Sequence, residues 1–267
     1  SAEDVRIVIE PKSRSVDAGL MMDPLVAPSP DESTMALLAS LPLSMRDRFD
    51  RVGVIGFGSG MTTHYLLGSQ RVGRVDTVEI EPLMVEGARL FRSRVPRAFD
   101  DPRSRVVIDD AKAFFSSSRA RYDLIVSEPS NPWMGGTASL FSDEFYRFVP
   151  RHLEPRGLFV QWLQLYEMDP ALVASVLRAM LPHFEDVQAY LANDGDLLLV
   201  ASPRGALPPP GPRVFADAAL RPELARLGIR DVRDLQDGFV LDRRALEVYA
   251  GLYAAPANSD FFPFLQL

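Results

Sequence analysis

Short apolar runs typical of β-strands alternate with amphipathic, helix-like segments from residue 52 onward. The first five strands are predicted at Val52–Ile55, Arg74–Ile80, Arg105–Ile108, Tyr122–Val126 and Leu158–Leu163. Helices are predicted between or after them at Thr63–Leu67, Pro82–Ser93, Ala111–Ser116, Ser142–Leu153 and Pro170–Leu181. A hairpin of Val187–Leu191 and Leu197–Ala201 completes seven strands. This alternation predicts an α/β fold with a mostly parallel, Rossmann-like sheet covered on both faces.

The segments before and after this core have different patterns. Residues 1–35 are predicted to form a small β-hairpin lead-in, and Thr34–Leu41 reads as a short helix that follows it. Residues 36–204 are then the Rossmann-like core domain. A proline-rich link ends the core, and residues 205–267 are predicted to be a helical extension packed on it.

Composition narrows the classes of function. The chain has a net charge of −7 and no basic stripe, which argues against nucleic acid as a partner and suits a small cationic substrate. It lacks cysteine, and its three histidines have no metal-ligand spacing, so we expect no metal. No apolar run reaches the roughly 18 residues that a membrane span needs, so we expect no membrane contact and a cytoplasmic location.

Three glycines at alternate positions follow the first strand: Gly56, Gly58 and Gly60. Glycines allow a sharp turn and let a ligand lie against bare backbone, while the next helix offers unpaired N–H groups. A dinucleotide loop reads G-x-G-x-x-G/A, and Met61 occupies its third small position here. The spacing therefore favours an S-adenosylmethionine-type ligand over NAD. The alternative is a glycine-rich turn that binds nothing.

Acidic residues follow the next two predicted strands. Ligands of open parallel sheets bind at the carboxyl ends of the strands. Glu79 ends strand two and is placed to accept from both hydroxyls of a ribose. The alternative role, a solvated acid at a helix start, suits Glu81 better. Asp110, or its neighbour Asp109, can accept from an exocyclic amine such as adenine N6; otherwise Asp110 caps a helix.

Glu128 follows strand four on a loop that contains Pro129 and Pro132. A carboxylate held on such a loop can accept a proton from a reacting amine or stabilise its cation. The alternative is a loop acid without chemistry. Trp133, Trp162 and Tyr166 are candidates to wall a pocket over the same sheet edge, or else belong to the core.

From about residue 51 to residue 164 the chain resembles the polyamine aminopropyltransferases, the spermidine synthase family, which have a class I methyltransferase-like fold. The matching pieces are Val54–Gly60, Val78–Pro82, Asp101–Arg103, Asp109–Ala111, Tyr122–Ile125 and Ser139–Phe141 with Glu144–Tyr146. The stretch Ser127–Trp133 is similar to a bacterial branch in which the domain often follows a membrane-spanning region. The resemblance thus makes this chain a candidate for the soluble part of a longer, membrane-anchored protein.

The resemblance implies that Glu79 binds ribose, that Asp110 binds adenine and that Glu128 takes the place of the aspartate that activates the amine. The nucleoside-binding set becomes Gly56, Gly58, Ser59, Gly60, Glu79, Ile80, Asp109, Asp110 and Ala111. The substrate set becomes Asn131, Trp133, Trp162 and Tyr166.

Three positions depart from the family pattern. Ser59 and Asn131 stand where the family usually has aspartates, and Thr34, with Met35 beside it, stands where it has a tyrosine. Two negative charges that would attract a cationic amine are therefore missing. We expect the nucleoside half of the site to be kept and the amine half to be rebuilt, with putrescine a poorer acceptor than for an ordinary spermidine synthase.

The expected function is transfer of an aminopropyl-type group from S-adenosylmethionine, or its decarboxylated form, to a small-molecule amine, with release of methylthioadenosine. Positioning supplies most of the catalysis, because a sulfonium is already a good leaving group. Two alternatives stay open. One is a methyltransferase or S-adenosylmethionine-cleaving lyase on the same fold, and the other is a nucleoside-binding sensor without catalysis. We also expect a homodimer.

Overall fold

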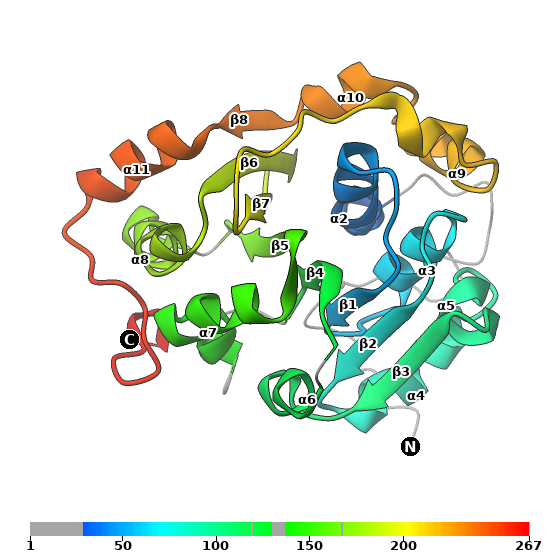
Figure 1. Ribbon diagram of the computed structural model, residues 1–267, viewed down its shortest axis with the longest axis horizontal. Coiled ribbons are helices and arrows are strands. Elements are labelled where there is room, and N and C mark those ends of the chain that lie inside the picture. The colour runs from blue at the N-terminus through cyan, green and yellow to red at the C-terminus, as the bar shows by residue number, and fades with distance from the viewer. Residues whose placement is uncertain (1–28, 119, 130–136, 167, 267) are drawn as a thin grey trace.

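An eight-stranded sheet with the order β3-β2-β1-β4-β5-β7-β6-β8 forms the centre of the molecule (Figure 1). The computed structural model describes residues 29–118, 120–129, 137–166 and 168–266. The strands are β1 (Val52–Ile55), β2 (Val75–Glu79), β3 (Ser104–Ile108), β4 (Tyr122–Ser127), β5 (Leu153–Gln164), β6 (Asp186–Asn193), β7 (Asp196–Ser202) and β8 (Phe239–Leu241). The five strands from β3 to β5 are parallel, and β7 pairs with β5 in the antiparallel direction. The predicted Rossmann-like α/β fold is confirmed.

Helices cover both faces of this sheet (Figure 1). They are α2 (Pro30–Met45), α3 (Met61–Leu67), α4 (Pro82–Ala88), α5 (Pro96–Asp100), α6 (Ala111–Ser117), α7 (Asp143–Phe148), α8 (Pro170–Met180), α9 (Leu220–Arg226), α10 (Val232–Gln236) and α11 (Arg243–Leu252). Short 3₁₀ turns occupy Arg89–Phe91, Thr137–Phe141, Val149–Arg151, Leu181–His183, Pro212–Ala216 and Phe264–Gln266. Within the described parts of the chain, no helix is both long and apolar enough to cross a membrane.

Polar caps explain where several helices begin. Ser29 accepts from the N–H of Glu32 at 3.2 Å, and Pro30 then opens α2. Asp169 likewise caps α8 by accepting from the N–H of Ala171 at 2.7 Å. Each such cap stabilises a helix by about 1 kcal/mol, because it satisfies an N–H that has no partner within the helix.

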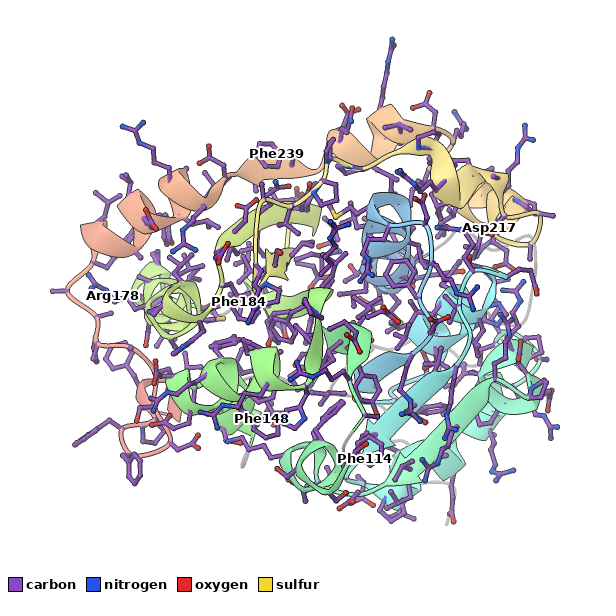
Figure 2. The ribbon with its side chains drawn as sticks, viewed as in Figure 1. Phe114, Phe148, Arg178, Phe184, Asp217 and Phe239 are labelled. Atoms are coloured by element: carbon purple, nitrogen blue, oxygen red, sulfur yellow. The ribbon has the colours of Figure 1, made fainter. Side chains whose placement is uncertain are left out.

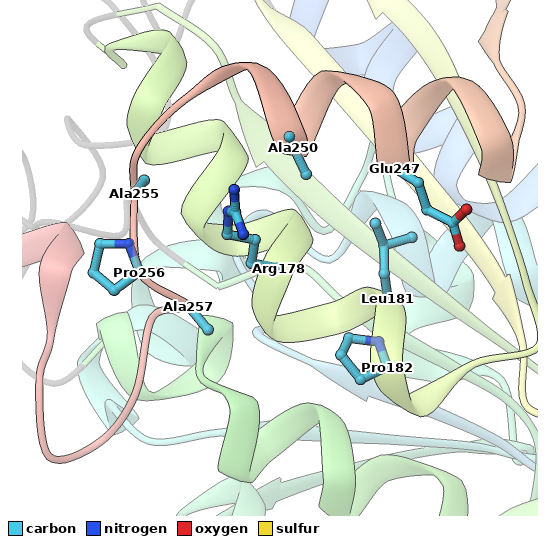
Figure 3. A pocket seen from close by; sticks show the side chains of 9 residues that line it. Arg178, Leu181, Pro182, Glu247, Ala250, Ala255, Pro256 and Ala257 are labelled. Carbon is cyan, nitrogen blue, oxygen red and sulfur yellow. The ribbon is translucent and has the colours of Figure 1, made fainter.

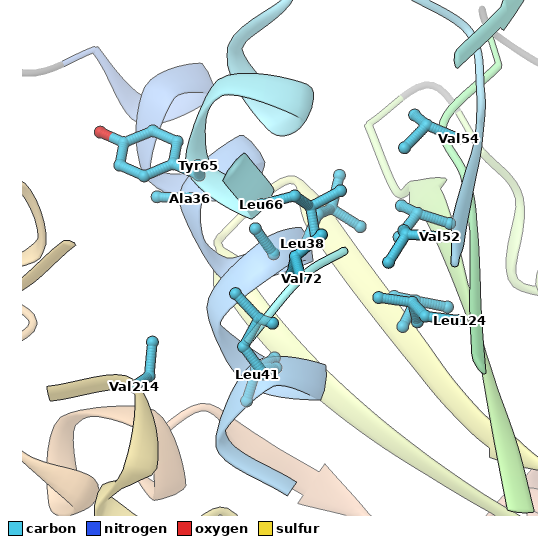
Figure 4. Close-up of a cluster of buried hydrophobic side chains, with 14 of the residues drawn as sticks. Ala36, Leu38, Leu41, Val52, Val54, Tyr65, Leu66, Val72, Leu124 and Val214 are labelled. Atoms are coloured by element: carbon cyan, nitrogen blue, oxygen red, sulfur yellow. The ribbon is translucent and has the colours of Figure 1, made fainter. Parts of the chain in front are cut away.

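Two apolar layers hold the helices on the sheet. Val52, Val54 and Leu124 face α2 and α3, as the cluster in Figure 4 shows. The alternate residues of the strands face α6, α7 and α8, where Phe159 stacks on Phe184 with ring centroids 5.5 Å apart (Phe184 is labelled in Figure 2). Because both faces are buried, the central strands are apolar at nearly every position.

The sheet has one strand more than the predicted seven. Beyond β7 the chain runs along the outside of the molecule from α9, through α10 and β8, to α11 (Figure 1). There β8 pairs with β6 through Tyr190 opposite Phe239 and Ala189 opposite Leu241. β8 is only three residues long and half exposed, so it lacks the continuous apolar pattern that predicts a buried strand.

The three-part division of the chain stays a prediction. The proposed N-terminal hairpin lies outside the described residues, and the boundary drawn after residue 35 falls within α2. The C-terminal segment is joined to the core by ion pairs such as that of Arg71 with Asp217, 2.9 Å apart (Asp217 is labelled in Figure 2).

A second set of ion pairs between the C-terminal segment and the core predicts that acid lowers the stability of the fold. Glu223 of α9 accepts from Arg97 at 2.7 and 3.0 Å, and its carboxylate lies 3.6 Å from His64 Nε2. Burial alone would raise the pKa of Glu223, but hydrogen bonds from His64 and Arg97 outweigh it and lower the pKa to about 2. A folded-state pKa below the unfolded value contributes stability above the unfolded pKa and loses it as the pH falls.

We therefore expect Glu223→Gln to lower the melting temperature at pH 7. The gap between parent and variant should shrink as the pH falls from about 4.5 toward 2. Thermal unfolding of both proteins across this range measures it. A gap that stays constant with pH would show that the charge of Glu223 contributes nothing.

Candidate functional site

The glycine loop between β1 and α3 is tightly wound. Gly56, Gly58 and Gly60 have φ angles of 91°, 51° and 83°, a region that residues with a Cβ rarely adopt. At Gly60 a Cβ would also lie 3.0 Å from the ring of Phe57 and 3.1 Å from the Cβ of Ala98. Backbone conformation and close packing thus both explain the glycines, which leave the loop without side chains at these positions.

The predicted residues that end β1 to β4 meet at one edge of the sheet. The N–H of Glu128 donates to the carbonyl of Ile55 at 2.9 Å, which joins the end of β4 to that of β1. The N–H of Asp109 donates to the carbonyl of Glu79 at 3.1 Å, which joins β3 to β2. The glycine loop, Glu79, Asp109 and Glu128 therefore lie together at one edge of the sheet, as the strand order requires.

Glu79 forms a hydrogen bond with the backbone of the glycine loop. Its buried carboxylate accepts from the N–H of Phe57 at 2.8 Å with one oxygen and from the N–H of Glu81 at 3.0 Å with the other. Each carboxylate oxygen has a further lone pair, so two vicinal hydroxyls can still be bound. Glu81 caps α4 by accepting from the N–H of Leu83 at 3.0 Å, which confirms the helix-start role considered for it.

The acids after β3 have local partners. Asp110 caps α6: its Oδ1 accepts from the N–H of Ala113 at 2.9 Å, and Ala111 is the first residue of the helix. Asp109 accepts from the N–H of Asp110 at 2.8 Å. The capping role considered for Asp110 is thus confirmed. It occupies one oxygen of an exposed carboxylate and leaves the second for another donor.

Two apolar side chains are exposed beside these acids. Ile80, directly after β2, is 70% exposed, and Ile108, the last residue of β3, is 50% exposed. Exposed isoleucines at the ends of adjacent strands offer a flat apolar surface, and the carboxylates next to them offer acceptors. This combination suits a purine ring that carries an exocyclic amine.

Glu128 is buried, with 6% of its surface exposed. Its Oε2 accepts from the hydroxyl of Thr62, on the first turn of α3, at 2.6 Å. The carboxylate is therefore oriented by the helix that the glycine loop opens. Thr62 was missed in the sequence, because nothing local pairs it with a residue 66 positions away.

The predicted substrate residues are only partly described. Trp162 packs against the layer between the sheet and α2, and its indole N–H donates to Asp196 at 2.9 Å. Tyr166 lies two residues beyond β5 and is 42% exposed. Asn131 and Trp133 lie outside the described residues. Asp196 was missed because it reads in the sequence as a turn residue beside the closing hairpin.

The position where an aspartate was expected in the loop faces α2 instead. The hydroxyl of Ser59 donates to the sulfur of Met35 at 3.5 Å, so a neutral contact replaces a negative charge. No group of three or more described histidines, aspartates and glutamates is placed to hold a metal ion. A separate pocket lies between α8 and α11 and is lined by residues such as Arg178, Leu181 and Glu247 (Figure 3); it contains none of the strand-end residues.

NAD should not bind usefully to this loop. Met61 fills the small-residue position of the dinucleotide pattern, and its side chain is buried against the core. We expect calorimetry to show no NAD affinity in the micromolar range, while an adenosine thioether binds. Micromolar binding of NAD would overturn the interpretation of the loop.

Comparisons with known proteins agree with this geometry. A curated relative, the polyamine aminopropyltransferase of Caldicellulosiruptor bescii, is 29% identical over 155 residues, which are 58% of this chain and 55% of that protein. The chain thus spans about half the length of the curated relatives it matches.

Solved structures share the fold. A spermidine synthase in complex with the transition-state analogue AdoDATO superimposes with a TM-score of 0.66 at 21% identity, covering 83% of this chain and 76% of the other. Human methyltransferase-like protein 13 in complex with SAH gives a TM-score of 0.50 at 19% identity, covering 82% and 89%. The fold is therefore of the spermidine synthase and methyltransferase type.

The profile of the spermine/spermidine synthase domain matches residues 32–193. The match includes the glycine loop, the ends of β1 to β4 and Glu128. Because it covers more than half of the sequence, the chain belongs to the spermine/spermidine synthase domain family.

Proposed function

We propose that this chain is an aminopropyltransferase. It moves an aminopropyl group from decarboxylated S-adenosylmethionine to an amine and releases methylthioadenosine. The observation that carries the proposal is the buried carboxylate of Glu128, held by Thr62 beside a glycine loop that suits a nucleoside. The relatives named polyamine aminopropyltransferase and the family membership support it.

The proposed reaction is a direct displacement. The lone pair of the amine nitrogen attacks the aminopropyl carbon bonded to the sulfonium, and the carbon–sulfur bond breaks with its electron pair going to sulfur. The sulfur becomes a neutral thioether, and the new secondary amine carries a proton that Glu128 can accept. Since the leaving group is already activated, binding and orientation provide most of the acceleration, and the carboxylate adds general-base assistance.

In the nucleoside half of the site, the end of each strand is proposed to contact a different part of the ligand. Glu79 binds the ribose hydroxyls, Asp110 or Asp109 accepts from the adenine amine, and Ile80 covers the ring. These assignments are supported by the lone pairs that Glu79 and Asp110 keep and by the exposure of Ile80. A bound adenine would remove this apolar surface from water.

A product analysis tests the proposal. The protein is incubated with S-adenosylmethionine or its decarboxylated form, each with and without polyamines, and products are identified by mass spectrometry. Aminopropylated amine together with methylthioadenosine supports transfer. S-adenosylhomocysteine would indicate methylation, methylthioadenosine without an acceptor would indicate cleavage, and binding without turnover would indicate a sensor.

A further inference from the structure

A buried carboxylate stands on the amine side of the site, at the start of β7. Asp196 is 9% exposed, and Trp162 donates to its Oδ1 at 2.9 Å. Its Oδ2 accepts from the hydroxyl of Thr34 at 2.6 Å and from the amide of Asn193 at 2.8 Å. Thr34 is the residue that replaces the expected tyrosine. The changed position on α2 therefore orients an acid that the sequence did not place in the site.

The negative charge of Asp196 has no cationic partner among the described residues. Its three donors are neutral, and it takes part in none of their salt bridges. Asp31, on the first turn of α2, lies close enough to be affected: burial and, next, the charge of Asp196 raise the pKa of Asp31. Buried charges are usually paired, because removal from water is costly. Among the described residues, the charge of Asp196 is therefore left without a compensating cation.

Strand register places this charge on the same face of the sheet as the proposed reacting group, two residues further along. Ser127 of β4 is opposite Gln161 of β5, so Glu128 continues opposite Trp162. Trp162 in turn is opposite Leu198 of β7, and Asp196 is two residues earlier on the same face. Glu128, Trp162 and Asp196 therefore cross three neighbouring strands on the face covered by α2 and α3.

The distance across these strands suits an elongated amine. Neighbouring strands are about 4.8 Å apart, so β4 and β7 are separated by about 10 Å with β5 between them. The contact of Met35 with Ser59 connects this face to the glycine loop. An indole between two carboxylates can also hold a cationic chain against its ring.

We propose that Asp196 is the specificity-determining residue that binds the second positive charge of a linear diamine or polyamine while its reacting nitrogen lies at Glu128. Trp162 lies between the two ends. This inference rests on the proposed function and names the residue that would select an amine with two separated positive charges over a monoamine. The charge lost at positions 59 and 131 is then supplied from β7.

Calorimetric titration tests the assignment without turnover. The protein, with and without methylthioadenosine, is titrated with 1,4-diaminobutane, 1,5-diaminopentane and butylamine. The parent should bind at least one diamine roughly tenfold or more tightly than butylamine. Asp196→Asn should weaken that diamine by about 10- to 100-fold, the range for loss of one charge-assisted hydrogen bond, and leave butylamine unchanged.

Two further variants distinguish the loss of the negative charge of Asp196 from a structural effect of the substitution. Asp194→Asn makes the same change at an exposed position of the same hairpin and should bind the diamines like the parent. Asp196→Glu keeps the charge and should recover part of the preference for diamines, whereas a purely structural role predicts that it is as harmful as Asn. Thermal unfolding confirms that each variant is folded.

Two results would overturn the inference: a parent without preference for a diamine, or Asp196→Asn with diamine affinity within twofold of the parent. The product analysis is independent of both. If transfer occurs and Asp196→Asn has no effect, the inference fails and the proposed function stands. If diamine binding depends on Asp196 but no aminopropylated product forms, the proposed function fails instead.

Discussion

Glu128→Gln should lower the rate of aminopropyl transfer by roughly 10²- to 10⁴-fold, the range for loss of general acid–base assistance. Glutamine has the size of glutamate and can still accept from the hydroxyl of Thr62, so the local structure should be kept. It removes the charge that stabilises the amine cation and the site that accepts its proton. Methylthioadenosine affinity should stay within a few-fold of the parent. Single-turnover kinetics and calorimetry measure the two effects separately.

The control is Glu86→Gln, the same change at an exposed position of α4, which should be neutral in both measurements. Thr62→Val gives a finer test of positioning. It removes the donor that orients Glu128 and should lower the rate less than loss of the carboxylate does. Full activity of Glu128→Gln would return Glu128 to the status of an ordinary buried loop acid.

Glu79→Ala should weaken methylthioadenosine binding by about 100-fold or more. Each hydrogen bond to a charged group contributes roughly 1.5–3 kcal/mol, and two ribose hydroxyls lose their acceptor together. The variant also leaves the N–H groups of Phe57 and Glu81 without their partner, at a cost of about 1–3 kcal/mol each where they are buried. We therefore expect a lower melting temperature even without ligand. Calorimetry measures the loss of methylthioadenosine affinity, and thermal unfolding measures the loss of stability.

Glu81→Ala provides the matched control for this prediction. Glu81 is two residues away and caps α4, so its loss should cost about 1 kcal/mol of stability and leave nucleoside affinity nearly unchanged. Glu79→Gln keeps one acceptor and should be intermediate. Parent-like affinity of Glu79→Ala for methylthioadenosine would show that the ribose assignment is wrong.

The central strands were predictable because strands that are buried on both faces appear in the sequence as nearly continuous apolar runs. β1 was predicted at its observed bounds, and the observed ends of β2, β3 and β4 lie within one residue of those predicted. Their order along the chain, with helices between them, then places Glu79, Asp109 and Glu128 at one edge. The short α5 and β8 were missed, since neither is long enough to show a hydrophobic period.

The amine side could not be predicted in the same way. Thr34, Trp162 and Asp196 meet although they are far apart in the sequence, and each has an ordinary local role as a helix, strand or turn residue. The pairing of β5 with β7 and the hydrogen bond from Trp162 show that the acid lies beside the indole. The proposed nucleoside side depends on the glycine loop and the strand ends, whereas the proposed amine side depends on contacts between distant segments. The predicted homodimer stays a prediction.

One quantity tests the central claim most directly: the molar ratio of the two products in a single reaction. The protein is incubated with decarboxylated S-adenosylmethionine and an excess of linear diamines, and methylthioadenosine and aminopropylated amine are quantified together by mass spectrometry. Transfer by direct displacement predicts equal amounts of the two, and neither product when the amine is omitted. Methylthioadenosine released to the same extent without an amine, or the absence of both products, would contradict it.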